Sequence, residues 1–458
     1  MNAQRYTVIG LGGSGLSAVN FLAAQGHQVA VTDQNPAPAL ADKLPSGVMR
    51  AFGAIDGQML LDSDCIIISP GVDPRIKAVV DAKQAGVRVI SDVQLFIETL
   101  KEIDQKQAKH TPIIAITGSN AKSTVTTLVG QMAANAGVVV GVGGNIGTPA
   151  LELLTIAGLQ MVVLELSSFQ LEHIYDLSAD VATVLNISAD HLDRHDGMAD
   201  YLAQKLKIFE GAKAAVICQD DATLAKECQQ SLTKVAKIIT TASQSDQPAD
   251  FSLAQMAGEL VLCHGQEVLL NANRLKVKGK HNLLNALSAL ALGQAVGLPM
   301  TAMLDTLVNF KGLPHRCEYV DEVAGKAYFN DSKGTNIGST LAAIDGLGVV
   351  YGEQSLALIL GGQGKGQDFG QLADEVYRWA NGVYLIGADA ALIEQDLLGK
   401  YPNLADRLHQ VAILDKAVVL ASQSDAKAVL LSPACASLDQ FKNYGERGDR
   451  FVELVKSL

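Results

Sequence analysis

PIIAITGSNAKST, residues 112–124, is the stretch that decides the fold of the central part of this chain. It is typical of a buried β-strand, a turn of small residues and a helix that begins at Lys122. Backbone N–H groups of such a turn can surround phosphate groups, a lysine can neutralise their charge, and a following hydroxyl can bind Mg²⁺. Ile116 and Ala121 stand where the full Walker pattern has glycine. We predict a glycine-poor phosphate-binding loop; the alternative is an ordinary strand-to-helix turn with a surface lysine.

Polar side chains follow or interrupt the apolar runs that come after this loop. Asn145 follows one expected strand, Glu165 lies within the run VVLEL, and His191 follows LNISAD. Because the carboxyl ends of parallel strands meet at one edge of a sheet, we expect these side chains beside the phosphate loop. Glu165 and His191 are therefore candidate Mg²⁺ ligands or water-orienting groups. The alternative for each residue alone is a hydrogen-bonded structural role.

A second glycine cluster lies near the N-terminus. Gly10, Gly12 and Gly15 satisfy GxGxxG between an expected strand and helix, and Asp33 ends the next strand. Glycines let the backbone approach a phosphate group, and a helix N-terminus favours its negative charge. Taken alone, the pattern predicts a bound nucleotide such as NAD; a tight turn without a ligand is the alternative. The segment SPGVDP, 69–74, offers another turn at a strand end.

The last third of the chain carries two loops that combine glycine with lysine. NDSKGTN, 330–336, contains Lys333, and GGQGKG, 361–366, contains Lys365. SPACAS, 432–437, ends a further apolar strand with small residues. Such loops on one sheet edge suit a ligand with carboxylate groups. The alternative is a pair of solvated lysines and a serine that caps a helix.

Short β-branched runs alternate with glycine turns and helical patterns along the chain, which indicates parallel sheets with crossover helices. A chain of 458 residues exceeds what one core usually supports. We predict an α/β fold of three domains: a Rossmann-like N-terminal domain (1–107), a central P-loop ATPase-like domain with a parallel sheet (108–311) and a C-terminal Rossmann-like domain (312–458). The polar segment KEIDQKQAKHT, 101–111, is interpreted as a linker. The expected strands include 28–33, 65–69, 112–118, 161–166, 181–188, 214–218, 356–362 and 427–433, with a helix near 281–296.

Composition narrows the class of protein. Hydrophobic residues make up 48% and charged residues 18%, which supports packed cores over disorder. The net charge of −12 opposes binding to nucleic acid and to anionic membrane surfaces. The six cysteines show no CxxC spacing, as in a reduced cytosolic protein. Since no signal-like start and no bilayer-length apolar run are present, we expect a soluble, cytoplasmic protein.

The order of these motifs along the whole chain resembles the Mur ligase family, and within it the members that add D-glutamate. The matching segments are GLGGSGLS (10–17), SPGV (69–72), TGSNAKSTVTTLVG (117–130), GVGGNIG (141–147), LELSSFQLE (164–172), HLDRH (191–195), KGKHNLLNALSALAL (278–292), GLPHRCE (312–318), NDSKGTN (330–336), GGQGKG (361–366) and SPACASLDQFKNYGERG (432–448). Agreement over eleven segments in one order is not expected by chance.

The resemblance implies an ATP-dependent amide ligase that adds D-glutamate to UDP-N-acetylmuramoyl-L-alanine through an acyl phosphate. It implies a role in peptidoglycan synthesis, hence in cell-wall growth, cell shape and cell division, and a cytoplasmic monomer. The cofactors implied are ATP and two Mg²⁺ ions. It also implies that the first domain binds uridine diphosphate, which replaces the NAD interpretation.

Site residues follow from the resemblance position by position. The implied contacts with the UDP substrate are Gly13, Ser14, Asp33, Gly71 and Asn145. The implied ATP contacts are Gly118, Ser119, Asn120, Ala121, Lys122, Ser123, Thr124, Asn282, Asn285, Arg316 and Asp331. The implied D-glutamate contacts are Thr335, Lys365, Ser437, Leu438 and Tyr444. The implied metal ligands are Ser123, Glu165, His191 and a carbamylated Lys205, and the implied catalytic residues are Lys122, His191, Lys205, Lys333 and Lys365.

Two positions depart from the family pattern, and three alternatives remain. Ala121 replaces the usual loop glycine, and Tyr444 stands where phenylalanine is common. If the φ angle at residue 121 is positive, the extra methyl group tightens the loop. The first alternative is a related Mur ligase that adds L-alanine or a diamino acid, or a folate polyglutamate synthase. The others are a dehydrogenase and a nucleotide-binding regulator without turnover.

Overall fold

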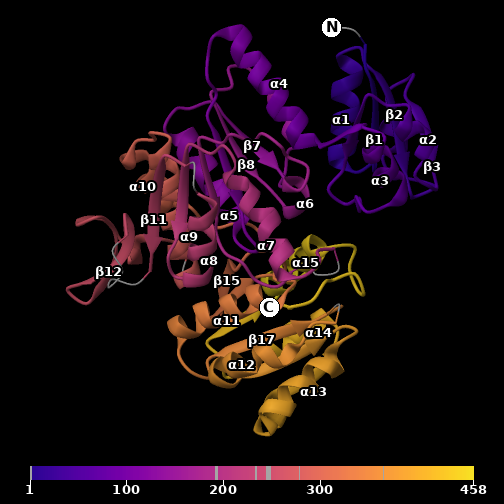
Figure 1. Cartoon of the computed structure of the whole chain (residues 1–458). Helices are drawn as coiled ribbons and strands as arrows, with labels where there is room; N and C mark the ends of the chain where they lie inside the picture. Colours follow the sequence, from indigo (N-terminus) through magenta and orange to yellow (C-terminus); the bar gives the residue numbers. More distant parts are fainter. Residues whose placement is uncertain (1–2, 191–193, 233–234, 244–248, 278, 365) are drawn as a thin grey trace. The chain divides into compact units, whose positions relative to one another are not determined.

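The computed structural model describes residues 3–190, 194–232, 235–243, 249–277, 279–364 and 366–458. The chain forms two compact units (Figure 1), which are described separately. Unit 1 comprises Met1–Leu270 and Asn285–Leu307, and unit 2 comprises Asn271–Leu284 and Val308–Leu458. Within the described ranges, we find no helix that combines the length and apolarity needed to cross a bilayer.

The first sheet of unit 1 is five-stranded, and all its strand pairs are parallel. Its order is β3 (Met49–Phe52), β2 (Gln28–Asp33), β1 (Arg5–Ile9), β4 (Cys65–Ile68), β5 (Arg88–Ser91). The helices that accompany it are α1 (Gly13–Ala24), α2 (Gly57–Leu61), α3 (Lys77–Gln84) and the short 3₁₀ helix η1 (Ala41–Lys43). Side chains alternate between two cores, with Val8 on one face and Ile9 on the other. This arrangement confirms the predicted Rossmann-like fold.

The interpretation of 101–111 as a linker is wrong over its first seven residues. They form the end of helix α4 (Asp92–Gln107), which Ser91 caps by accepting a hydrogen bond from Gln94 N at 3.1 Å. Phe96 and Leu100 are buried on one face of this helix, while Glu102, Gln105 and Lys106 are exposed. The polar composition of the segment therefore reflects the exposed face of an amphipathic helix and not a loop.

The second sheet of unit 1 has nine strands. Its order is β14 (Glu267–Asn271), β13 (Glu259–His264), β12 (Phe251–Met256), β11 (Lys237–Ala242), β10 (Ala214–Cys218), β9 (Val181–Val184), β6 (Ile113–Thr117), β8 (Met161–Glu165), β7 (Val140–Gly144). The pairs from β7 to β12 are parallel, as predicted, whereas β12 and β13 are antiparallel. The helices are α5 (Lys122–Asn135), α6 (Ser168–Leu171), α7 (Met198–Leu206), α8 (Ala222–Ser231) and α10 (Met300–Asn309), with 3₁₀ helices η2 (Ala150–Thr155) and η3 (Lys207–Phe209). The 3₁₀ helix η4 (Ala272–Arg274) belongs to unit 2, and α9 (Lys280–Ala295) includes residues of both units.

The central strand β6 lies between β8 and β9, and all three run parallel. Their carboxyl ends therefore share one sheet edge, and the chain leaves that edge at Gly118, Leu166 and Leu185. This edge carries the candidate site of unit 1.

Unit 2 contains a six-stranded sheet, coloured orange to yellow in Figure 1. Its order is β15 (Glu318–Val323), β16 (Lys326–Asn330), β20 (Ala428–Leu431), β17 (Leu356–Gly361), β18 (Ala380–Ile386), β19 (Leu408–Ala412). Only the pair β15–β16 is antiparallel among the pairs described. The helices are α11 (Ile337–Tyr351), α12 (Ala373–Trp379), α13 (Ala390–Lys400), α14 (Leu414–Ser422) and α15 (Tyr444–Lys456), with η5 (Phe369–Leu372) and η6 (Pro402–Arg407). Leu358 and Ile359 enter separate cores on the two faces, as a doubly covered sheet requires.

Candidate functional site

The predicted phosphate loop connects β6 to α5, and its neighbours hold its backbone in place. Ala121 immediately precedes α5 with φ of 63°, a left-handed conformation that favours glycine. Asn120 N donates to Asn186 Oδ1 at 2.8 Å, and Asn186 Nδ2 donates back to Asn120 O at 3.1 Å. Ser119 Oγ accepts from Ser188 N at 2.9 Å. The loop that follows β9 thus braces this turn.

Two lysine side chains converge on one carbonyl group of the loop. Lys122 Nζ donates to Gly118 O and to Ser119 O, both at 2.9 Å. Lys205 Nζ, from α7, donates to the same Gly118 O at 2.8 Å. The turn therefore brings two lysine nitrogens together where phosphate oxygens would lie. Ser123 and Thr124 follow at the buried start of α5.

Lys205 is 1% exposed, although lysine is rarely buried. Burial, and then the positive charge of Lys122, lower the pKa of Lys205 to about 6. Its ammonium nitrogen lies 4.6 Å from the centre of the Tyr201 ring and 3.4 Å from Thr117 Oγ1. At neutral pH most Lys205 side chains are consequently unprotonated, and a neutral amine is a nucleophile.

Glu165 ends β8 beside the loop and is 2% exposed. Its Oε1 accepts from Asn145 Nδ2 at 2.8 Å, whereas its Oε2 has no hydrogen-bond partner among the residues that the structure describes. A buried carboxylate oxygen without a partner fits a site for a hard cation such as Mg²⁺. His191, the other predicted side-chain ligand, lies outside the described residues. Within the described ranges no three His, Cys, Asp or Glu side chains gather into a metal site.

A cavity of about 510 Å³ lies at the carboxyl edge of the first sheet. All five predicted UDP-substrate residues line it, namely Gly13, Ser14, Asp33, Gly71 and Asn145. The Asp33 carboxylate braces two of the lining loops, because it accepts from Leu11 N at 2.7 Å and from Asn35 N at 2.8 Å. Gly15 permits the close approach of α1 to β1, since a Cβ there would meet Gly10 O at 2.0 Å.

Sequence reasoning missed Gln170 as a residue of this cavity. Its Oε1 accepts from Ser167 N at 3.1 Å in a capping box at the start of α6. Gln170 lines the cavity, and its side chain also interacts with the buried carboxyl of Asp92. The SxxQ capping pattern in SSFQ was the available signal for its position, but not for its role.

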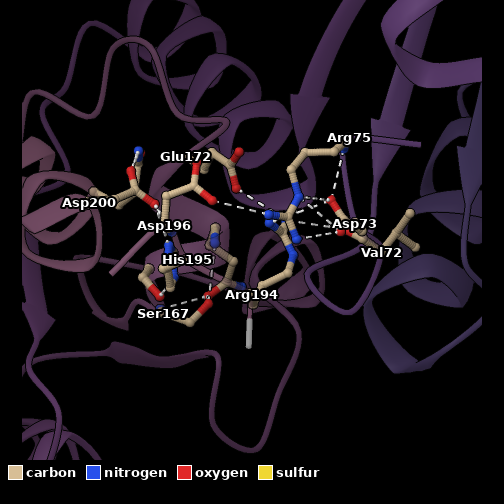
Figure 2. Close-up of polar contacts among 12 residues, drawn as sticks. Val72, Asp73, Arg75, Ser167, Glu172, Arg194, His195, Asp196 and Asp200 are labelled. Atoms are coloured by element: carbon tan, nitrogen blue, oxygen red, sulfur yellow. Dashed lines mark hydrogen bonds and ion pairs between the residues drawn. The ribbon is translucent and has the colours of Figure 1, made fainter. Parts of the chain in front are cut away.

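Sequence reasoning also missed Arg194 and His195, the last two residues of HLDRH. Arg194 Nη2 donates to Glu172 Oε2 at 3.2 Å, and its Nη1 lies 3.7 Å from Asp73 Oδ1 (Figure 2). His195 Nε2 lies 2.9 Å from Ser168 Oγ, and Nδ1 lies 3.1 Å from Asp200 Oδ2. Basic residues after a strand end were the only signal in the sequence.

In unit 2 the predicted residues lie on loops at the carboxyl edge of the third sheet. Asp331 follows β16, and burial raises the pKa of Asp331 to about 7 although Ser432 Oγ donates to its Oδ2 at 2.6 Å. Lys333 Nζ lies 5.0 Å from the centre of the Tyr444 ring. Ala434 N donates to Gly334 O at 2.9 Å and so joins the two loops.

The other predicted residues of unit 2 differ in exposure. Ser437 is buried, whereas Leu438 and Tyr444 are exposed. Thr335 follows Lys333 on the same loop. Arg316 lies between His315 and Cys317, both of which have positive φ. Lys365 lies outside the described residues.

Two predicted nucleotide contacts, Asn282 and Asn285, lie three residues apart on α9. Residues at this spacing share one face of a helix.

Sequence reasoning overlooked Arg447, which lies under the loops of unit 2 and is 1% exposed. Its Nε donates to Ser332 Oγ at 2.9 Å, and its Nη2 donates to Ser332 O at 2.8 Å and to Cys435 O at 3.1 Å. Burial lowers the pKa of Arg447 to about 10, which leaves it charged at neutral pH. It therefore links the loop after β16 to the loop after β20.

Comparison with known protein families gives three consecutive matches. They are the Mur ligase MurD-like N-terminal domain over residues 4–91, the Mur ligase middle domain over 116–293, and the Mur ligase glutamate ligase domain over 315–435.

Similar curated proteins share the name UDP-N-acetylmuramoylalanine–D-glutamate ligase. The protein of Psychrobacter arcticus is 51% identical, covering 98% of this chain and 94% of its own length. The protein of Acinetobacter baylyi is 46% identical, covering 98% of each chain. That of Pseudomonas aeruginosa is also 46% identical, covering 98% of this chain and 97% of its own length.

Similar solved structures share the fold at lower identity. UDP-N-acetylmuramate-alanine ligase MurC from Thermotoga maritima has a TM-score of 0.62 at 19% identity and covers 99% of each chain. A pseudomurein peptide ligase type C from Methanothermus fervidus has a TM-score of 0.59 at 16% identity, again over 99% of each chain.

Proposed function

Since this chain belongs to the Mur ligase family, we propose that it joins D-glutamate to UDP-N-acetylmuramoyl-L-alanine with ATP in peptidoglycan precursor synthesis. Curated relatives 46–51% identical over nearly the whole chain carry the corresponding name. The observation that carries the proposal is the phosphate loop, on which Lys122 and Lys205 converge at Gly118 O beside the unpaired Glu165 oxygen.

The reaction consists of two displacements. The alanine carboxylate attacks the γ-phosphorus of ATP, the bond to ADP breaks, and an acyl phosphate forms. The D-glutamate nitrogen then attacks the acyl carbon, phosphate leaves, and the amine loses a proton as the amide forms. No nucleophilic side chain is required, so the chain contributes positioning and electrostatic stabilisation.

In this proposal the backbone N–H groups and side chains of residues 118–124 bind the ATP phosphates. Lys122 turns from the Gly118 and Ser119 carbonyls towards the phosphoryl group and stabilises its charge. Mg²⁺, when bound, neutralises phosphate charge, and we propose two ions held by Ser123, Glu165, His191 and Lys205. The unpaired Glu165 oxygen supports this assignment. Asn282, Asn285, Arg316 and Asp331 are proposed as further nucleotide contacts.

Lys205 is proposed to become a carbamate. Its neutral nitrogen attacks the carbon of CO₂ and loses a proton, which converts a buried amine into a carboxylate-like metal ligand. Its burial and lowered pKa support this reaction, because a protonated lysine has no lone pair to react. Mass spectrometry under native conditions would detect the added mass of CO₂.

The remaining substrate contacts belong to the same proposal. The cavity lined by Gly13, Ser14, Asp33, Gly71 and Asn145 is proposed for the UDP substrate, and the N-terminus of α1 at Gly13 supports an anionic occupant. In unit 2, Lys333, Thr335, Lys365, Ser437, Leu438 and Tyr444 are proposed to hold and orient D-glutamate.

We also propose domain boundaries at 1–107, 108–311 and 312–458, with a monomer acting in the cytoplasm during cell-wall growth and division. The three consecutive family matches support this division of the chain.

Phosphate release tests the function directly. We expect ATP hydrolysis only when UDP-N-acetylmuramoyl-L-alanine and D-glutamate are both present, with L-glutamate, L-alanine and a diamino acid inactive. Lys122→Ala should lower the rate by about 100-fold or more, because charge on the transferred group loses its counter-charge. Near-normal phosphate release by Lys122→Ala, or turnover with L-glutamate, would contradict the proposal.

A further inference from the structure

Two parts of unit 1 form the UDP cavity jointly. Residues 10–15, 33–35 and 69–72 come from the first sheet, whereas Gly144, Asn145 and Gln170 come from the second. The cavity is therefore complete only while the loop after β4 is held against the residues that follow β7 and β8. The contact that secures this loop decides how well the cavity is formed.

Arg194 makes the less exposed of the contacts that hold this loop. Its Nη2 donates to Val72 O at 3.5 Å, and its Nη1 lies 3.7 Å from Asp73 Oδ1, both on the loop after β4. The same guanidinium donates to Glu172 Oε2 at 3.2 Å, just after α6. Figure 2 shows the Arg194 guanidinium between Glu172 and Asp73. One planar cation thus joins the two sheets' loops, which suits arginine better than lysine because its donors form a fixed fork.

Arg194 differs from Arg75, the other cation on Asp73. Arg75 donates to both Asp73 oxygens from its own loop, at 2.8 to 3.1 Å, and its Nη1 also donates to Asp196 Oδ1 at 3.4 Å. Both ends of this second contact are exposed, at 52% for the Arg75 side chain and 86% for that of Asp196. The Arg194 side chain is 15% exposed, so water and salt screen its interactions less. The hydrogen bond from Arg75, helped by Arg194, lowers the pKa of Asp73 to about 2, which keeps the carboxylate ionised.

The next residue, His195, anchors the segment that carries Arg194 to helices α6 and α7. His195 packs inward, with Nε2 2.9 Å from Ser168 Oγ on α6 and Nδ1 3.1 Å from Asp200 Oδ2 on α7. Helix α7 also carries Tyr201, whose hydroxyl lies 3.2 Å from Ser119 Oγ of the phosphate loop. The Ser168–His195–Asp200 arrangement looks like a hydrolytic triad, but Ser168 is only 2% exposed. We therefore interpret these contacts as packing that orients His195.

We propose that Arg194 is a positioning residue that clamps the loop 69–73 onto the second sheet and thereby sets the UDP-linked substrate in register with the phosphate loop. The inference rests on the proposed function, because it concerns how that substrate is held. Its physical basis is preorganisation: a clamp formed before binding reduces the cost of ordering the loop around the ligand.

The test compares Arg194→Met with Arg75→Met. Arg194→Met should raise KM and Kd for UDP-N-acetylmuramoyl-L-alanine by about 10- to 100-fold, since the cavity loses its second wall. KM for ATP should change less than about twofold, because no clamp contact reaches the nucleotide. Arg194→Lys should not restore affinity. Arg75→Met removes a cation from the same carboxylate and should change either value less than about threefold.

A smaller ligand separates the clamp from general damage. We expect UMP to contact the first-sheet loops alone, so its Kd should change less than about twofold in Arg194→Met. If UMP weakens as much as the full substrate, the mutation has distorted the loop itself and the clamp is wrong. Unchanged affinity for the full substrate would also overturn it.

A second variant changes Asp73, the partner of Arg194, and keeps the proposal testable if Arg194→Met does not fold. Asp73→Asn should weaken the full substrate in the same way, and the double variant should be no weaker than the worse single one, because both remove one contact. Additive effects would overturn the clamp. Substrate binding is measured by calorimetry, so this test does not depend on turnover. If the wild-type protein binds the substrate but shows no D-glutamate-dependent phosphate release, the proposed function is wrong and the clamp is still tested.

Discussion

Each compact unit buries one basic side chain under the loops of its candidate site, and the two side chains behave differently. Lys205 in unit 1 has a pKa lowered to about 6, because of burial and the nearby charge of Lys122. Arg447 in unit 2 has a pKa lowered to about 10, because of burial. The first is mainly neutral near pH 7, whereas the second remains charged.

The hydrogen bonds match the protonation states. Lys205 donates to Gly118 O and lies near Thr117 Oγ1, which leaves its nitrogen few fixed partners. Arg447 donates three hydrogen bonds to Ser332 and Cys435 and so joins two loops. A buried lysine can exchange its proton for chemistry, while a buried arginine serves as a permanent link. The comparison therefore separates a reactive group from a structural one.

The largest expected effect on the reaction comes from Lys205→Arg, which places in unit 1 the residue type that unit 2 buries. Lys205→Arg keeps a long cationic side chain but removes the neutral amine, so the carbamate cannot form. We expect phosphate release to fall by about 100-fold or more, as for loss of a metal-site group. The measurement is steady-state phosphate release with both substrates. Lys207→Arg, on the adjacent 3₁₀ helix, is the matched control and should stay near the wild-type rate. Lys205→Arg with more than about half the wild-type rate would show that the reactive-lysine view is wrong.

Arg447→Met tests the other side of the comparison and should have a smaller effect on the reaction. Two buried carbonyl groups lose their donor, at a cost of about 1–3 kcal/mol each in free energy of unfolding. Looser loops should raise KM for D-glutamate by about tenfold with little change in KM for ATP. Urea unfolding and substrate titration measure the two quantities. Arg450→Met, whose side chain is exposed on the same helix, is the control. An equal rise in both KM values would indicate general destabilisation instead.

The smallest expected effect is a pH dependence of stability that belongs to Lys205 alone. Its pKa is about 6 in the folded chain, against 10.5 for an unperturbed lysine, so the unfolded chain binds the proton more tightly between these values. Stability therefore rises with pH across this window, by at most about 1.4 kcal/mol per pH unit. The penalty is greatest below pH 6 and disappears above 10.5. Unfolding of carbonate-free wild type and Lys205→Met between about pH 6.5 and 8.5 should differ in slope; parallel curves would refute the assignment.

The sequence predicted the elements that are locally encoded. Continuous apolar runs identified β6, β8 and β17, because strands covered on both faces need apolar side chains at every position. The polar segment at the end of α4 was misread, since the exposed face of an amphipathic helix resembles a loop when its apolar face is not counted. The antiparallel pair β12–β13 was missed, because its pairing extends the sheet at an edge that local pattern does not specify.

The candidate site could be predicted from the sequence where a side chain contacts residues of its own loop, as Lys122 contacts Gly118 and Ser119. The five residues proposed to contact the UDP substrate were assigned through the family resemblance, and in the structure all five line one cavity. Arg194 and Arg447 were missed, because their roles depend on partners 22 to 122 residues away for Arg194, and 12 to 115 residues away for Arg447. A basic side chain whose partners lie far away in the sequence leaves no periodic pattern in a single sequence.

The left-handed alanine that precedes α5 has a thermodynamic consequence for nucleotide binding. Alanine samples fewer backbone states than glycine, so less conformational freedom is left to lose when the turn meets a triphosphate. The reciprocal Asn120–Asn186 bonds already hold that turn in shape. Calorimetry should accordingly find a less unfavourable binding entropy for this chain than for its Ala121→Gly variant, at the expense of strain carried permanently by the protein.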